Sequence, residues 1–286
     1  MKGYKAFHKG LICKDKQYKE NTVFEEKEAI PCVTGMHFCE NPMDVLTYYP
    51  LIDDEGEFSD FAEVEALDEV KTDNDKKFCT TRLKIGAKLS FAGFINACVD
   101  FILEKTRYEP DECDEDSAKI GSSGDYAKIG SSGYSAQIGS SGDYAQIGSS
   151  GYSAQIGSSG YSAQIGSSGY SAQIGSSGYS AKIGSSGYSA KIGSSGDYAQ
   201  IGSSGDYAQI KCTGDDSVVC CAGYNSCASA KKGCWITLSE WKYSKEKDRF
   251  VPTCVKTEYV DGEKIKEDTM YSLKDGEFVE VCEHNE

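Results

Sequence analysis

The middle of this chain is a tandem repeat of nine residues. Eleven near-copies of the sequence (Y/D)(S/Y)A(Q/K)IGSSG run without insertion from residue 116 to residue 214, and two decayed copies continue the pattern to residue 232. A fixed period without gaps is typical of a solenoid, in which each unit buries its apolar face only by stacking on another copy. The repeat therefore constrains the architecture strongly, but it does not reveal an activity.

Each repeat predicts one short strand and one corner. In the unit 152–160, Ala154 and Ile156 are two positions apart, so both point to the same face of a strand. The GSSG segment supplies the turn, because glycine adopts positive φ without steric cost. We predict that two units close one coil of about 18 residues, with two sheets about 10 Å apart. The predicted inward columns are Ile120, Ile138, Ile156, Ile174 and Ile192 on one wall, and Ile129, Ile147, Ile165, Ile183 and Ile201 on the other.

Tyrosines recur on the predicted exterior. From residue 134 to residue 188 the first position of every second unit is tyrosine, and the intervening units have aspartate or tyrosine there. A period of 18 stacks the first group as one exposed column. Tyrosine suits recognition, because it buries a large area and offers a hydroxyl group. The predicted binding surface consists of Tyr134, Tyr152, Tyr161, Tyr170, Tyr179 and Tyr188.

The repeat offers candidate ligands for two metals, calcium and zinc. The period resembles that of calcium-binding nonapeptide rolls, but GSSG lacks their aspartate, and Asp125 and Asp143 recur irregularly. Near the end of the array, Cys212 and Cys221 replace the first serine of GSSG, and Cys220, Cys227 and Cys234 lie nearby in the sequence. A zinc cluster is the alternative here, but the spacings fit no CxxC pair and no histidine lies near. Free cysteine also packs as a compact apolar residue. We therefore predict buried thiols, no metal site and no cofactor.

The flanks differ from the repeat. Ahead of it, the segments GYKAF, TVFEE, GMHFC, FAEVEAL and FCTTRLKIG indicate strands. Asn41 and Pro42 mark the start of a short helix, and residues 91–105 carry apolar side chains at helical spacing.

After the repeat, the sequence indicates an antiparallel meander. A solenoid end exposes an unpaired strand edge, which invites aggregation unless it is covered. Trp235 and Trp241 follow the array directly, and Asp261 and Asp275, each followed by glycine, mark tight turns. We predict that this segment caps the solenoid.

These patterns predict a mainly β fold in four parts. They are a small α/β domain at 1–108, an acidic linker at 109–115, a central parallel β-solenoid at 116–232 and an antiparallel β cap at 233–286.

Charge, apolar stretches and cysteines indicate which partners and which compartment to expect. The formal net charge is −15, the acidic excess lies in the flanks, and no Lys/Arg cluster indicates direct nucleic-acid binding. No stretch of about 18 apolar residues predicts a membrane span. The first ten residues lack the apolar core of a signal peptide, and 13 scattered cysteines fit reduced thiols. We expect a cytoplasmic protein.

The segment 35–42, GMHFCENP, followed by Tyr48 and Tyr49, resembles the opening domain of uncharacterised phage and prophage proteins. Those proteins join a GxHFCENPxDVxxYY domain to tandem nonapeptide repeats and a WxxLxEW-type tail. The resemblance covers nearly the whole chain. It implies a phage-type origin and hence the cytoplasm of a host cell, and it implies no established activity.

The same segment is similar to the GIYFA…Y element of ADP-ribosyltransferase-like folds. His8, in HKG, is similar to their HGT element, and Glu63 or Glu65 takes the place of their glutamate. This resemblance implies that His8 holds the nicotinamide ribose of NAD, that Glu65 orients the acceptor, and that His37 replaces a tyrosine. The alternative is that His37 is a satisfied strand histidine and that the tyrosine pair is core.

Three functions compete at this stage. The leading hypothesis is a non-enzymatic protein-binding scaffold, which binds a host protein as an inhibitor or decoy, or a second copy of itself as a homodimer. The alternative is an NAD-dependent transferase domain carried on a solenoid, and a Cys39–His37 nucleophile pair was also considered. The third is a rod with an ice-binding wall.

Overall fold

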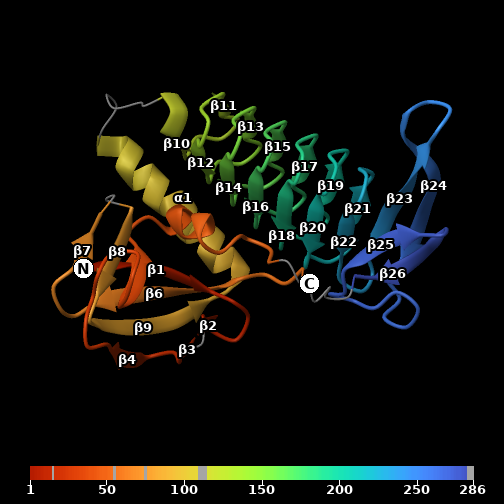
Figure 1. The fold of residues 1–286 in the computed structure, drawn as a ribbon. Coiled ribbons are helices and arrows are strands. Elements are labelled where there is room, and N and C mark those ends of the chain that lie inside the picture. The colour runs from red at the N-terminus through yellow and green to blue at the C-terminus, as the bar shows by residue number, and fades with distance from the viewer. Residues whose placement is uncertain (15, 54–55, 74–75, 109–114, 282–286) are drawn as a thin grey trace.

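The computed structural model describes residues 1–14, 16–53, 56–73, 76–108 and 115–281. It is mainly β, with 8% helix and 47% strand, as the sequence predicts. An N-terminal sheet lies below one end of a solenoid, a long helix lies between them, and two hairpins finish the other end (Figure 1). The predicted linker falls almost wholly outside the described residues.

The N-terminal domain is one antiparallel sheet with a helix. Its seven strands follow the order β4-β9-β6-β1-β5-β8-β7, and β2 and β3 form a separate ribbon. Four of the five segments expected as strands are each one strand, and the fifth, FCTTRLKIG, is divided at Thr81 between β8 and β9. The bounds are β1 Lys2–Phe7, β2 Ile12–Cys13, β3 Lys16–Gln17, β4 Thr22–Glu25, β5 Met36–Cys39, β6 Asp60–Ala66, β7 Lys71–Thr72, β8 Lys77–Thr80 and β9 Arg82–Leu89.

Two helical segments complete this domain. The 3₁₀ helix η1 (Pro42–Thr47) begins at the predicted cap, where the Asn41 side chain accepts a hydrogen bond from the Met43 N–H at 3.0 Å. The helix α1 (Phe91–Tyr108) follows β9, and Phe94 stacks on Phe61 with ring centroids 3.6 Å apart. The predicted helix is confirmed and is longer than expected.

The solenoid has about 18 residues per turn and about seven turns, from residue 119 to residue 238. Each strand pairs in parallel with the strand two units later, so two units make one coil as predicted. The bounds are β10 Lys119–Ser122, β11 Lys128–Ser131, β12 Gln137–Ser140, β13 Gln146–Ser149, β14 Gln155–Ser158, β15 Gln164–Ser167, β16 Gln173–Ser176, β17 Lys182–Ser185, β18 Lys191–Ser194, β19 Gln200–Ser203, β20 Gln209–Cys212, β21 Val218–Cys221, β22 Cys227–Ser229 and β23 Trp235–Ser244.

The two predicted isoleucine columns form the core. Ile138, Ile174 and Ile192 are fully buried, and the alanine beside each isoleucine is buried too. Cys212 and Cys221 continue the interior where the repeat decays. Burial raises the pKa of Cys212 to about 11, so this residue is a packed thiol at neutral pH.

The last glycine of each unit lies at a corner, where stacked coils come too close for a side chain. A Cβ on Gly169 would lie 1.8 Å from the carbonyl oxygen of Gly151, one coil earlier. Aspartates at the first position bind the next coil: Asp125 Oδ1 accepts from the Asp143 N–H at 3.0 Å, and Asp143 Oδ1 from the Tyr161 N–H at 2.8 Å. The aspartates weighed as calcium ligands are thus acceptors for backbone groups.

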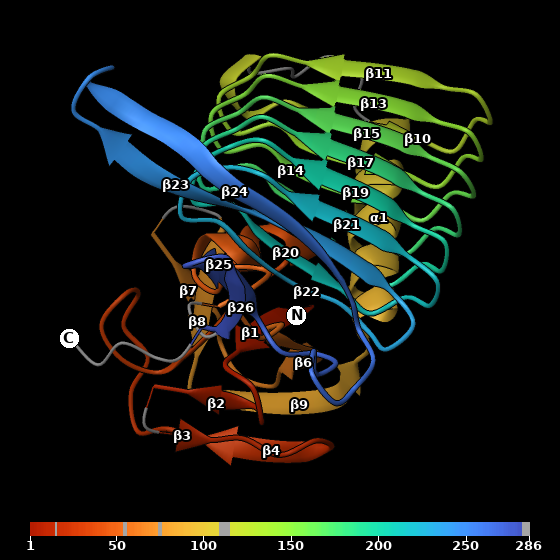
Figure 2. The ribbon, with the colours of Figure 1, turned by 90° about the vertical axis from the view of Figure 1, so that its right-hand side faces the viewer.

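Both sheets of the solenoid end on an antiparallel hairpin, as the predicted cap requires (Figure 2). The start of β23 pairs in parallel with β21, and all of β23 pairs with β24 (Arg249–Tyr259). On the other sheet, β25 (Tyr271–Lys274) meets β22 and pairs with β26 (Glu277–Glu280). Pro252 and charged side chains on β24 keep this edge from pairing further.

Candidate functional site

The two walls of the solenoid differ in what covers them. We call the outer face of the sheet β10-β12-β14-β16-β18-β20-β22 the covered wall, because α1 lies on it (Figure 1). We call the outer face of β11-β13-β15-β17-β19-β21-β23 the open wall. Each wall presents two rows, one of Gln and Lys and one of glycine, because residues two apart on a strand share a face.

The glycine row of the covered wall receives α1. A Cβ on Gly193 would lie 2.8 Å from the Phe91 ring, and a Cβ on Gly175 would lie 2.3 Å from Ile95 Cδ1. A Cβ on Gly139, two coils before Gly175, would have Val99 and Ile102 as its nearest neighbours. The absent side chains therefore make the space that the helix occupies.

The Gln/Lys row of the covered wall clamps the segment around η1. Gln137 accepts a hydrogen bond from Asn41 Nδ2 at 2.7 Å and donates one to Asp44 Oδ1 at 2.9 Å. Gln173 Oε1 accepts from the Leu51 N–H at 3.0 Å, and Lys191 Nζ donates to the Ile52 carbonyl at 2.7 Å. Three coils of the covered wall thus bind one N-terminal segment in chain order, and Gln155, on the coil between the first two, accepts a hydrogen bond from Gln137 at 3.1 Å.

Lys211 ends the covered glycine row, and the sequence analysis missed it. It replaces glycine in register with Gly193, and its Nζ lies 2.9 Å from Glu57 Oε2 and 3.2 Å from the Gly56 carbonyl. Burial raises the pKa of Glu57, but the bonds from Lys211 and Lys9 outweigh it and hold that pKa below its usual value. The signal was available, since IKCTG is the first unit to depart from IGSSG.

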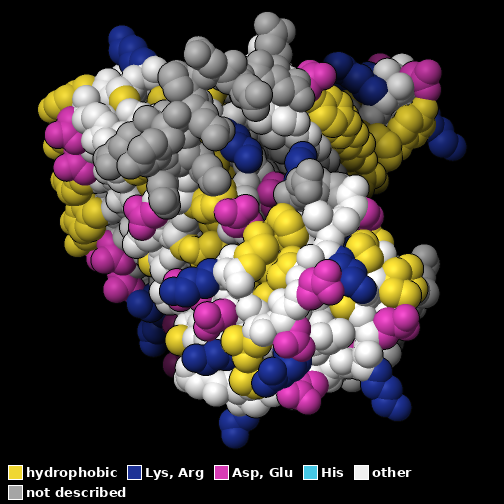
Figure 3. All heavy atoms as spheres, turned by 90° about the vertical axis from the view of Figure 1, so that its left-hand side faces the viewer, with side chains coloured by type: hydrophobic (Ala, Val, Ile, Leu, Met, Phe, Trp, Pro, Cys, Tyr) yellow, Lys and Arg dark blue, Asp and Glu magenta, His cyan; other side chains and the backbone are white. Residues whose placement is uncertain are grey.

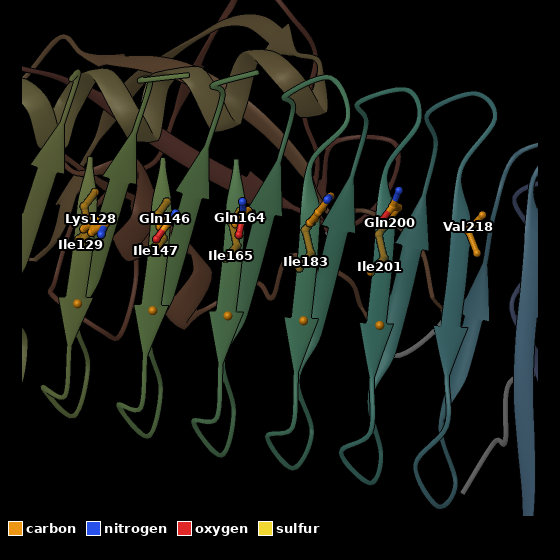
Figure 4. A pocket seen from close by; sticks show the side chains of 16 residues that line it. Lys128, Ile129, Gln146, Ile147, Gln164, Ile165, Ile183, Gln200, Ile201 and Val218 are labelled. Atoms are coloured by element: carbon orange, nitrogen blue, oxygen red, sulfur yellow. The ribbon is translucent and has the colours of Figure 1, made fainter. Parts of the chain in front are cut away.

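The open wall is a shallow trough of about 1010 Å³. Its Gln and Lys side chains stand in a row on successive strands, as Figure 4 shows for Lys128, Gln146, Gln164 and Gln200. Beside them run the bare glycines, and none of the described residues that line the trough is a carboxylate. The lining glycines are Gly130, Gly148, Gly166, Gly184 and Gly202.

Tyrosines stack along both narrow edges of the solenoid, where hydrophobic side chains gather in the end-on view (Figure 3). The first column contains the four predicted tyrosines and continues to Tyr207; its rings stack 4.7–4.9 Å apart. Tyr161 and Tyr179 belong to a second column on the opposite edge, with Tyr126, Tyr144 and Tyr198. All six predicted residues are 37–54% exposed. The tyrosines lie at corners, so they flank the walls.

A second candidate site is a pocket of about 630 Å³ in the N-terminal domain. His8 and His37 both line it, together with Tyr49 and Cys39. The Tyr49 ring meets the His8 ring edge-on at 5.0 Å, and its hydroxyl donates to Cys13 Sγ at 3.1 Å. The structure thus brings two of the three residues of the NAD hypothesis to one place.

The pocket is lined by several lysines, although the chain as a whole is acidic. Its lysines are Lys5, Lys14, Lys16 and Lys77, whereas Glu26 is its one acidic lining residue among those described. Lys5 is 6% exposed, and its Nζ donates to the His37 carbonyl at 2.9 Å; burial lowers its pKa. A positive pocket with aromatic walls suits a planar anion.

Glu65 lies outside this pocket. It pairs with Lys2 at one end of β1, and His8 follows the other end of that strand. Six residues of strand separate the two positions by about 20 Å. The arrangement implied by the transferase resemblance is therefore not assembled. The predicted nucleophile pair of Cys39 and His37 is a separate case. Burial raises the pKa of the Cys39 thiol to about 12, so Cys39 supplies no thiolate to His37 at neutral pH.

His37 predicts a pH-dependent stability. Burial, with nearby Lys77, Lys5 and Lys14, lowers its pKa from 6.5 to about 4. Between pH 6.5 and 4 the unfolded chain binds a proton that the folded chain does not, so stability falls with falling pH in this window. Because the ring is partly exposed, we expect a loss of about 1–2 kcal/mol.

The measurement is thermal unfolding of the wild type and of His37→Gln at pH 7.5, 6, 5 and 4. Glutamine keeps an acceptor for the Cys32 N–H, which His37 Nε2 binds at 3.1 Å, but it does not titrate. The stability difference between the two proteins is expected to shrink or reverse toward pH 4. A constant difference over this range would contradict the assignment.

The comparisons identify only the opening domain. Residues 1–97 match a family described as a domain of unknown function, DUF7666. The match runs from β1 into α1 and leaves the solenoid outside. No curated protein and no solved structure matches the chain. Across the described ranges, no three His, Cys, Asp or Glu side chains gather as a metal site would require.

The helices were also compared with membrane spans. In the part of the chain that the structure describes, none of them combines the length and the apolar character that crossing a bilayer requires.

Proposed function

We propose that this chain is a non-enzymatic binding protein whose solenoid is a rigid scaffold for a protein partner. The observation that carries the proposal is the open wall, which is bare along the rod while the opposite wall holds the chain's own N-terminal domain. Exposed tyrosine columns flank it on both edges. Flat surfaces with aromatic margins are typical of interaction sites.

The partner proposed is a protein of a host cell. The phage-type resemblance of residues 35–42 supports this step. The acidic flanks favour basic groups on the parts of the partner that reach them, beyond the open wall. In this proposal the chain acts in the host cytoplasm and inhibits its partner as a decoy. Self-association through the tyrosine columns is the competing form of the same function.

The test compares the two tyrosine columns. Wild-type chain, Tyr134/Tyr152/Tyr170/Tyr188→Ser and Tyr161/Tyr179→Ser are each measured by light scattering and by capture of partners from host extract. We expect the wild type to retain a discrete partner, and the column in contact to lose at least tenfold in affinity when its rings are removed. A wild type that stays monomeric and captures nothing would refute the function.

The pocket favours a second candidate function, binding of a nucleotide-like anion by the N-terminal domain. Four lysines and several aromatic rings line about 630 Å³, a volume in the usual range for small-molecule sites. Because Glu65 lies elsewhere, this function is binding without group transfer.

The probe is NAD, added to the intact chain in a calorimetric titration and in an assay for released nicotinamide. We expect binding without release, weakened at least fivefold in Lys77→Met and in His8→Ala, with Glu65→Ala unchanged. Turnover that disappears in Glu65→Ala would instead support the transferase. Absence of NAD binding would refute both the anion-binding function and the transferase.

A further inference from the structure

We infer that the open wall is the docking site for an amphipathic α-helix of a partner protein, lying along the rod over the glycine row. This inference rests on the proposed binding function and adds the shape and chemistry of the partner. It is argued from the covered wall, where the same repeat already holds a helix.

The covered wall shows the spacing that the repeat accepts. Phe91 lies over Gly193, Ile95 lies over Gly175, and Val99 and Ile102 lie over Gly139. Gly157, between them, is met first by Met43 of η1 and then by Val99. The four α1 residues are four, four and three positions apart. A helix rises about 5.4 Å per turn, and neighbouring strands lie about 4.8 Å apart, so one turn meets one coil. Each glycine leaves room for one bulky side chain.

The open wall repeats this surface. Strands β11, β13, β15, β17 and β19 each present a glycine, and the covered strands β10, β12, β14, β16 and β18 do the same at the equivalent position. The two rows therefore have the same length and pitch. An 18-residue helix such as α1, about 27 Å long, covers five coils.

The open glycines have no structural need within the chain. A Cβ on Gly130, Gly148, Gly184 or Gly202 would meet no atom within 4 Å. Glycine inside a strand costs about 0.5–1 kcal/mol relative to alanine. The space is therefore explained by an external side chain, as it is explained on the covered wall by α1.

The Gln/Lys row specifies what flanks the helix. On the covered wall this row binds an amide, a carboxylate and backbone groups of the segment around η1. On the open wall the same row contains Lys128 and Lys182, and no carboxylate is found in the described lining of the trough. The partner therefore carries carboxylates or free carbonyls along one margin of its helix.

A second copy of the chain does not fit this surface. Two open walls face to face bring the Gln/Lys row of one copy over either row of the other, and neither arrangement places an apolar side chain in the trough. The chain's own α1 is already buried on the covered wall, where Val99 is 1% exposed. The occupant is therefore a helix of another protein.

The probe is a labelled peptide with the α1 sequence, residues 90–108, stapled through the exposed positions 96 and 100. It is added to the intact chain and followed by fluorescence anisotropy. We expect saturable binding that weakens more than tenfold in Gly166→Val/Gly184→Val, because valine fills the trough. The added Cβ meets nothing within 4 Å at Gly184, and at Gly166 it meets the Ile147 carbonyl oxygen at 4.0 Å, which is an ordinary contact. The control, Val23→Ser, changes an exposed residue on β4 of the N-terminal sheet and is expected to bind as the wild type.

A second peptide, with aspartate in place of Ile95 and Val99, is expected not to bind. Circular dichroism establishes that the valine variant is folded. No binding by the α1 peptide, or binding that survives the valine substitutions, would overturn the inference. Because a partner held by the tyrosine columns would still be captured from extract, failure of the helix site and failure of the binding function give different results.

Discussion

Replacing Gly187 by alanine is expected to lower the free energy of unfolding by at least about 3 kcal/mol. Gly187 closes the corner of its unit, and a Cβ there would lie 1.8 Å from the carbonyl oxygen of Gly169 on the preceding coil. The obstacle is backbone, so no side chain can turn aside. The two coils must separate, which breaks bonds such as the one from the Ser186 N–H to the Ser167 carbonyl, at 3.0 Å.

The matched control is Gly184→Ala, three residues earlier in the same unit. A Cβ at that position meets no atom within 4 Å, so alanine is expected to be neutral or to stabilise by up to about 1 kcal/mol. Thermal unfolding followed by circular dichroism is the measurement, with an expected fall of about 6–12 °C for Gly187→Ala. Equal midpoints for the two variants would show that the corners are not tightly stacked.

Valine at Gly193 is expected to cost about 2–3 kcal/mol and to loosen α1 from the solenoid. The new Cβ would lie 2.8 Å from the ring of Phe91 and 2.9 Å from that of Phe58. These two rings stack with centroids 4.4 Å apart, so neither moves without disturbing the other. Valine at Gly184, on the open wall, is expected to leave stability unchanged or raised, because it favours strands and meets nothing.

Hydrogen exchange separates loss of the helix contact from general unfolding. In Gly193→Val the amides of α1 are expected to exchange faster while those of the β19 region keep their protection. Gly184→Val is expected to retain the protection of α1. If both variants lost stability alike, the difference between the covered and the open wall would be refuted.

The repeat made the solenoid predictable, because its alternation is simple. Isoleucine and alanine two positions apart fix one buried face, and the pair of units per coil follows from the space that a core requires. The cap followed from the unpaired edge, and the start of η1 followed from the pattern of Asn41 and Pro42. Each of these inferences needed only local sequence and one physical rule.

The second tyrosine column was not predicted, because the position of a tyrosine within its unit does not show to which edge of the solenoid its ring points. In DY units the ring comes from the second position, where Tyr144 and Tyr198 have φ of 56° and 57°. This backbone conformation aims them into the column of Tyr161 and Tyr179. The aspartate left at the first position binds the backbone of the next coil instead.

The division of the walls was equally hidden in the sequence. Both walls have the same two rows, and tertiary docking alone decides which one α1 covers. Lys211 was the one local sign, since it breaks the glycine row where Glu57 arrives. The position of Glu65 in the NAD hypothesis was hidden for a similar reason: strand register, which the motif does not encode, places Glu65 away from His8.

Because two units close each coil, the parity of the repeat number matters for this molecule. Loss of one unit from the array would transfer every later strand to the opposite sheet and would carry Lys211 away from Glu57. Loss of two would keep every later strand on its own sheet and shorten the rod by one coil, although Lys211 would then move to the place of Gly193 beside Phe91. Copy-number variants of this protein that still fold are therefore expected to differ by multiples of 18 residues, and the reach of the rod can change in evolution only by whole coils.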